Sequence, residues 1–303
     1  MSKTDSFPRS EWTASDILIV AIAFALLIVA TGALALRDQW APLVGAFSDV
    51  LVAISAFNTT DYHALAFDQR DPNIVYFGHH NGVMKSIDGG ITWSPVLGQG
   101  DAMSLATIDN AIILAGHEVF MRSDDGGANW KPIATDLPDQ DIHGFAVSPN
   151  NPSTFFAYIV TYGLWRSDDA GATWSLVSKE LPNSVLALAI VPTSPETVYA
   201  GTMDKGLLKS IDGGKTWQAA TGFDRQAAMT LTQDPRAPQI VFAGTESGLY
   251  RSNVEGTTWT RVAMNGKDVM TLAISRANPS RFLVVDGQGR VYRSDNGGST
   301  WKK

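Results

Sequence analysis

The side chains best suited to chemistry are histidines and methionines that recur at one position of a repeated pattern. Aligned on the first large apolar residue of each expected inner strand, the position two residues earlier is held by His63, Met103, His143, Leu186, Met229 and Met270. Nearby expected hairpins add His79, His80 and His117. Imidazole nitrogen and thioether sulfur suit copper, above all Cu(I), better than magnesium or zinc. The pattern predicts a copper site whose expected ligands are His63, His79, His117, His143 and Met103.

A second interpretation of the same residues needs no metal. Methionines can fill an irregular channel, and histidines can form its polar rim. The ligands follow no strict spacing, so both interpretations stay open.

Carboxylates are also expected on the face that carries the histidines. They are Asp61, Asp101, Glu118, Asp141, Glu246 and Asp268. A carboxylate pair about 5 or 9 Å apart could hydrolyse a glycosidic bond. Acidic loops also keep proteins soluble, and a sequence gives no distances, so a glycoside hydrolase is one alternative function.

The elements that must position these residues come from a motif that occurs six times, Ser-x-Asp-x-Gly-x-Thr-Trp, called the box here. Its tryptophans are 37 to 44 residues apart, at Trp93, Trp130, Trp174, Trp217, Trp259 and Trp301. Short apolar runs separated by turn residues precede each box, which predicts four short strands per repeat. Such units bury their faces by packing around an axis. The sequence therefore predicts an all-β, six-bladed β-propeller over residues 50–303.

The last repeat is too short to supply its own outermost strand. A β-rich segment from Val50 to Ser55 precedes the first repeat and has no other assigned place. We expect this segment to complete the sixth blade, which closes the ring and protects its edges.

The boxes resemble the Asp-box (BNR) motif of sialidase-like propellers, which is also found in sortilin-type receptors and photosystem II assembly factors. The resemblance covers residues 50–303 and implies that the box is a structural hairpin. In such a hairpin the Asp accepts backbone N–H bonds and the Trp packs between sheets. The acceptor positions are Asp88, Asp125, Asp169, Asp212 and Asn296, whereas the fifth box has Val254, which cannot accept. We therefore expect the fifth box to be the loosest.

The resemblance does not extend to sialidase activity. A sialidase needs three arginines from different blades that converge on one carboxylate. Here most arginines stand immediately before a box serine, as Arg122 and Arg166 do, or in turns on the box side, as Arg70 and Arg236 do. Only Arg225 and Arg290 are left for loops of the opposite face. The chain is also similar to exported bacterial propellers loosely named glycosyl hydrolases, through Tyr62-His63-Ala64-Leu65-Ala66 and its counterparts.

The N-terminal region predicts a membrane anchor. Residues 17–36 are 20 uncharged, mostly apolar residues, enough to span a bilayer as a helix. We expect residues 1–16 to be a cytoplasmic tail, 17–36 a transmembrane helix, and 37–49 a linker to an exported propeller at the inner membrane. Ala33-Leu34-Ala35 also fits a cleavage site, so a signal peptide stays the alternative.

Composition narrows the function classes. The net charge of −7 gives no basic footprint for nucleic acid, and a chain without cysteine has no thiolate metal site, disulfide or cysteine nucleophile. The sequence indicates no set of residues arranged for catalysis. The sequence favours a non-catalytic, membrane-anchored periplasmic propeller that binds a protein or serves as an accessory subunit of a membrane complex. A copper-binding propeller and a glycoside hydrolase are the alternatives.

Overall fold

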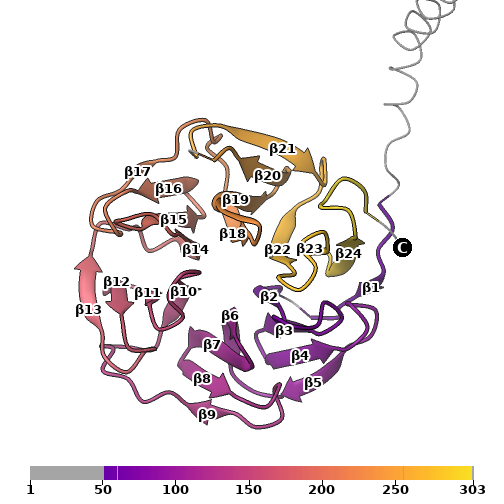
Figure 1. Ribbon diagram of the computed structural model, residues 1–303, viewed down its shortest axis with the longest axis horizontal. Coiled ribbons are helices and arrows are strands. Elements are labelled where there is room, and N and C mark those ends of the chain that lie inside the picture. The colour runs from indigo at the N-terminus through magenta and orange to yellow at the C-terminus, as the bar shows by residue number, and fades with distance from the viewer. Residues whose placement is uncertain (1–50, 60, 255, 302–303) are drawn as a thin grey trace, which may run out of the picture. The chain divides into compact units, whose positions relative to one another are not determined.

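The six predicted blades are present. The computed structural model describes residues 51–59, 61–254 and 256–301. These form six four-stranded antiparallel sheets arranged around a central axis (Figure 1). The fold is therefore an all-β, six-bladed propeller, as the repeats predict.

The strands of blades one to five run in sequence order from the axis outward, and in blade six the last three strands of the chain are followed by the first. The inner strands are β2 (Ala64–Phe67), β6 (Asp101–Ile108), β10 (Ile142–Val147), β14 (Val185–Val191), β18 (Ala228–Asp234) and β22 (Val269–Ile274). The second strands are β3 (Val75–His79), β7 (Ala111–His117), β11 (Phe155–Ile159), β15 (Thr197–Thr202), β19 (Ala237–Thr245) and β23 (Phe282–Asp286). The third strands are β4 (Gly82–Ser86), β8 (Val119–Ser123), β12 (Gly163–Ser167), β16 (Leu207–Ser210), β20 (Gly248–Ser252) and β24 (Arg290–Ser294). The outer strands are β5 (Ser94–Leu97), β9 (Lys131–Pro132), β13 (Ser175–Ser178), β17 (Gln218–Ala219), β21 (Trp259–Ala263) and β1 (Ser55–Ala56).

The core lies between neighbouring blades rather than inside any one of them. The second strands are apolar on both faces because each face meets another blade, and every residue of β11 and β23 is buried. The hydrophobic clusters accordingly combine side chains of two blades, such as Phe242 of blade five with Phe282 of blade six. A single blade could not bury these surfaces alone, so the ring forms one unit.

The ring is closed by the segment before the first repeat, as expected. Strand β1 pairs antiparallel with β24 and supplies the fourth strand of blade six. The strand covers Ser55–Ala56 rather than the expected Val50 to Ser55, and Val50 lies outside the described residues. Phe57 then stacks on Phe77 of blade one with ring centroids 3.7 Å apart. This segment therefore joins blades six and one.

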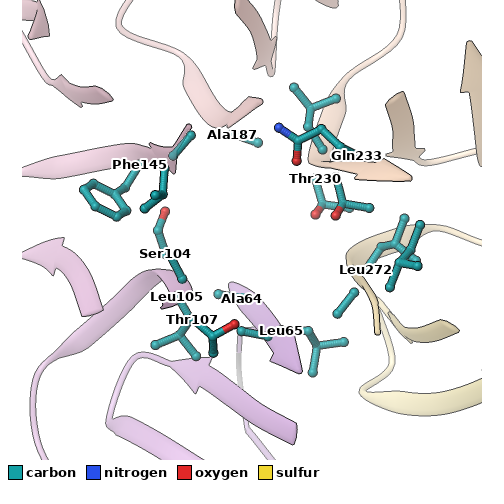
Figure 2. A pocket seen from close by; sticks show the side chains of 18 of the residues that line it. Ala64, Leu65, Ser104, Leu105, Thr107, Phe145, Ala187, Thr230, Gln233 and Leu272 are labelled. Carbon is teal, nitrogen blue, oxygen red and sulfur yellow. The ribbon is translucent and has the colours of Figure 1, made fainter. Parts of the chain in front are cut away.

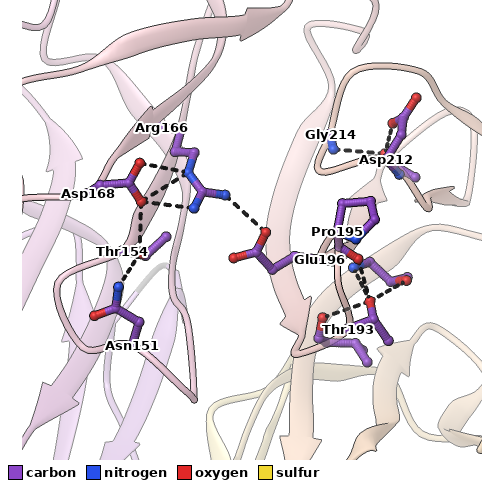
Figure 3. Close-up of polar contacts among 12 residues, drawn as sticks. Asn151, Thr154, Arg166, Asp168, Thr193, Pro195, Glu196, Asp212 and Gly214 are labelled. Atoms are coloured by element: carbon purple, nitrogen blue, oxygen red, sulfur yellow. Dashed lines mark hydrogen bonds and ion pairs between the residues drawn. The ribbon is translucent and has the colours of Figure 1, made fainter.

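The boxes form one repeated hairpin between the third and outer strands. In blade four, Ser210 Oγ accepts a bond from Gly214 N (2.8 Å), and Asp212 Oδ1 accepts one from Thr216 N (3.0 Å). Trp217 Nε1 donates to the Gly214 carbonyl at 3.0 Å. Figure 3 shows this hairpin beside the ion pair between Arg166 of blade three and Glu196 of blade four, 3.0 Å apart.

These hydrogen bonds favour the ionised form of the box carboxylates. The Thr173 hydroxyl and backbone N–H, followed by Ser167, lower the pKa of Asp169 to about 2. Bonds from Asn129 and Ser123 likewise lower the pKa of Asp125 to about 2. The carboxylates are therefore occupied as hydrogen-bond acceptors within their own turns.

The fifth box is built differently, because Val254 cannot accept a bond. Asn253, one residue earlier, accepts from Thr257 N at 2.8 Å and Thr258 N at 3.2 Å. Ser252 Oγ accepts from Val241 N instead of from the box glycine. Trp259 Nε1 is buried without a hydrogen-bond partner among the described residues. Blade five thus keeps the turn but lacks the hydrogen bond that the tryptophan Nε1 donates to the turn in the regular boxes.

The expected N-terminal segments 1–16, 17–36 and 37–49 lie outside the described residues. Within the part of the chain that the structure describes, no helix has the length and hydropathy needed to cross a bilayer.

Candidate functional site

A cluster of histidines and aspartates lies on the face opposite the boxes, called the site face here. Its members come from the starts of inner strands and from the hairpins between second and third strands of blades one to three. We call this cluster the mouth; it consists of Asp61, His63, His80, Asp101, His117, Asp141 and His143.

Asp101, at the start of β6, is the centre of the mouth. Its side chain is 8% exposed and meets three imidazoles from blades one and two. Oδ2 lies 3.0 Å from His80 Nδ1 and 2.9 Å from His117 Nδ1, and Oδ1 lies 3.2 Å from His63 Nε2. This arrangement joins the hairpins of blades one and two through one buried carboxylate.

The position of Asp101 depends on a glycine in the neighbouring strand. A Cβ at Gly116 would lie 1.7 Å from the Asp101 carbonyl oxygen, so only glycine allows β6 and β7 to approach here. The ladder between these strands has a register shift between Asp101 and Ser104. This irregularity places Asp101 opposite His117, its partner in the β6–β7 ladder.

A second group lies on the blade-three side of the mouth. His117 Nε2 is 2.8 Å from His143 Nε2, and both nitrogens are close to Asp141 Oδ1, at 3.4 and 3.3 Å. His117 therefore bridges the mouth, because its Nδ1 meets Asp101 while its Nε2 meets His143.

Burial favours the neutral imidazole at two positions of the mouth, His63 and His143. It lowers the pKa of His63, although Asp101 and Asp61 act in the opposite direction. It also lowers the pKa of His143, against the opposing effect of Asp141. A neutral imidazole has a free nitrogen lone pair, so it can accept a hydrogen bond or bind a metal ion.

The structure brings together His63, His117 and His143 of the five predicted metal ligands. His79 neighbours the mouth but makes different contacts: its ring stacks on Phe77 with centroids 5.6 Å apart, and its Nδ1 accepts a bond from Asn81 N. Met103 lines the central channel at the irregularity of β6.

Four mouth residues were not predicted as ligands: His80, Asp61, Asp101 and Asp141. The sequence carries a signal for the aspartates, because Asp61-Tyr62-His63 and Asp141-Ile142-His143 repeat at the same place in blades one and three. Residues two apart on a strand lie on the same side, so each Asp accompanies its His. His80 has no such signal, since its place depends on where β3 ends.

A central channel of about 370 Å³ runs behind the mouth along the inner strands (Figure 2). Its lining combines apolar side chains with polar groups such as Ser104, Thr230 and Gln233. His63 belongs to both the channel lining and the mouth. His63 is therefore the mouth residue that a group inside the channel could contact.

Comparison with known proteins identifies the fold. No protein-family model matches the chain, and no curated protein matches its sequence. A GH74 enzyme from Niastella koreensis is similar in structure, with a TM-score of 0.58, 19% identity, and coverage of 83% of this chain and 46% of that one. A GH74 xyloglucanase from Xanthomonas campestris gives a TM-score of 0.54 and 18% identity, over 82% of this chain and 54% of that one.

The structure of YCF48 bound to a D1 peptide is similar over most of both chains. Its TM-score is 0.53 and its identity 19%, with 82% of each chain covered. This chain spans about half the length of the two GH74 proteins, 46% and 54%. At such identities the likeness establishes a shared fold, and by that fold the chain is a β-propeller.

Proposed function

We propose that this chain is a non-catalytic binding propeller that docks a protein partner on its site face. In this proposal residues 17–36 anchor it in the cytoplasmic membrane and the propeller lies on the periplasmic or extracellular side, as an assembly or accessory subunit of a membrane complex. An anchor would raise the effective concentration of the propeller near partners in the same membrane.

The observation that carries this proposal is the asymmetry of the site face on a closed ring. The mouth concentrates charged and polar side chains of blades one to three, held together by contacts between 2.8 and 3.9 Å. All five histidines of the chain belong to these blades. A preformed surface of this kind loses little conformational entropy on binding.

The likeness to YCF48 supports a protein ligand. That propeller was solved with a D1 peptide, and the match covers 82% of both chains. The match to the GH74 enzyme covers only 46% of its length. A one-propeller binding module is therefore the better parallel for this chain.

The carboxylates of the mouth argue against the hydrolase alternative. Glycoside hydrolysis needs one carboxyl group to stay protonated as an acid while another is free to act as nucleophile or base. Asp61, Asp101 and Asp141 each lie within 4 Å of at least two histidines, so these carboxyl groups are engaged with imidazoles rather than directed at a substrate.

Affinity capture tests the docking function. The chain would be extracted from native membranes in mild detergent and captured through a C-terminal tag, and the mass of the eluted particle measured. We expect a discrete complex well above the 32.6 kDa of the chain. Glu118→Arg, on an exposed site-face hairpin, should release the partner, whereas Ile87→Arg, at an exposed box, should retain it. A bare monomer, or equal loss in both variants, would contradict docking on this face.

A carbonate wash of the membranes tests the anchor separately. An integral segment should keep the protein in the pellet, and release into the supernatant would overturn the anchored arrangement.

A further inference from the structure

The mouth contains two sets of side chains whose ligand atoms converge, one on each side of Asp101. We infer that it binds two divalent metal ions of the zinc type, through imidazole nitrogens and carboxylate oxygens. This goes beyond the docking function and does not depend on it.

The first ion site is formed by Asp61, His63, His80 and Asp101. His63 Nε2 lies 3.2 Å from Asp101 Oδ1 and 3.8 Å from Asp61 Oδ2. His80 Nδ1 lies 3.0 Å from Asp101 Oδ2 and 3.9 Å from Asp61 Oδ2. Two imidazoles thus face two carboxylates: the ligand atoms of Asp61, His63 and His80 lie within 4.8 Å of one another, and Asp101 contacts each imidazole through a different oxygen.

The second ion site is formed by His117, Asp141 and His143. The three distances between its ligand atoms are 2.8, 3.3 and 3.4 Å. Three protein ligands leave a coordination position open to water or to an incoming group, as in exchangeable zinc sites. His117 uses Nε2 for this set, and its Nδ1 meets Asp101 Oδ2 at 2.9 Å. A carboxylate on the far nitrogen of a metal-bound histidine orients the ring and raises its basicity.

The spacing of the ligand atoms agrees with tetrahedral coordination. Zinc binds nitrogen and oxygen at about 2.0–2.2 Å, so neighbouring ligand atoms of a tetrahedron are about 3.3–3.6 Å apart. The distances in the mouth, 2.8 to 3.9 Å, lie on both sides of this value. Small side-chain adjustments would therefore seat an ion in either set.

An independent observation supports a cation at the first site. His63 Nε2 and Asp101 Oδ1 are buried and face each other at 3.2 Å, yet neither has a hydrogen-bond partner among the described residues. Only 8% of Asp101 is exposed to solvent. A buried carboxylate oxygen without a partner destabilises the folded state. A cation between these two atoms would satisfy both.

The donor atoms also select the metal. Imidazole with carboxylate suits zinc and neighbouring divalent ions, whereas Cu(I) prefers thioether and thiolate sulfur. The thioether expected in a copper site, Met103, belongs to the channel lining. Zinc is therefore the ion we assign in place of the copper that the sequence pattern favours.

The test measures how many zinc ions the full chain binds and how tightly. The protein in detergent is first stripped of metal with a chelator and then titrated with Zn²⁺. We expect two ions per chain and a rise in Tm of roughly 5–10 °C at saturating zinc. Each site is tested by a double variant that should retain one ion. One carries His63→Ala and His80→Ala, and the other carries His117→Ala and His143→Ala. Asp101→Asn should weaken both sites by at least about tenfold.

His79→Ala is the matched control, because it removes a neighbouring histidine outside the mouth and should leave two ions bound. The melting temperature of each metal-free variant shows whether it still folds. Absence of zinc binding at micromolar concentration would overturn the proposal, as would equal loss in the His79→Ala control. Tight copper binding that Met103→Leu abolishes would overturn the ligand set.

Discussion

The two faces of the ring are formed by the same strands, yet they differ in what they repeat. On the box face, the hydrogen bonds of Ser210, Asp212 and Trp217 recur with the same partners in four other blades. On the site face, the corresponding strand ends carry the mouth in blades one to three only. Repetition around the ring therefore marks residues that hold the fold, whereas the mouth, which does not repeat around the ring, is the candidate for binding.

The largest effect should come from removing the strand on which both faces depend. A chain that begins at residue 58 lacks β1, so blade six keeps three strands and exposes the edge of β24. It also loses the Phe57–Phe77 stack between blades six and one. We expect aggregation in place of a folded monomer, measured by size exclusion and circular dichroism. A chain that begins at residue 51 is the control and should be monomeric.

An intermediate effect should separate the two faces. Trp174 is 8% exposed and packs against Phe120 of blade two and Phe155 of blade three. Trp174→Ala should lower the free energy of unfolding by about 3–5 kcal/mol because it opens a cavity between blades. Denaturant unfolding measures this change, and zinc stoichiometry below the transition should stay the same. Leu176→Ala, at a side chain 45% exposed, should change stability by less than about 0.5 kcal/mol.

The smallest effect should come from giving the fifth box the sequence of a regular box. It tests whether the repeated box residues stabilise the fold. Asn253→Ile with Val254→Asp gives blade five the Ile-Asp pair of Ile87 and Asp88. If the regular turn is restored, Trp259 Nε1 gains the carbonyl partner that other box tryptophans have. We expect a gain of about 1 kcal/mol, or roughly 2–4 °C in Tm. A loss of stability would mean that Asn253 serves this turn better than the regular acceptor.

The ring was predictable from sequence because its signal is repeated. Six tryptophans at steady spacing fix the number of blades, and the short last repeat shows that a strand must come from elsewhere. The exact bounds of β1 were not predictable, since a two-residue pairing has little sequence signature. Val254 correctly marked the irregular box, but not the use of Asn253 in its place.

The mouth was predictable only in part. His63 and His143 follow from aligning the inner strands, because equivalent positions converge at the axis. Whether His79 or His80 joins the mouth depends on the residue at which the strand ends, because adjacent residues of a strand point to opposite faces. The contacts of Asp101 with histidines of two blades depend on the approach that Gly116 allows, which no local pattern encodes. Metal binding itself stays a prediction.

The pairing of β1 with β24 also means that the two ends of the described chain meet. Leu51 packs against the same hydrophobic cluster as Trp301. A circular permutant that joins these ends through a short linker and opens the loop between β13 and β14 would keep every strand pairing of the six blades. Blade one is first only in the order of synthesis, and the folded ring has no first blade.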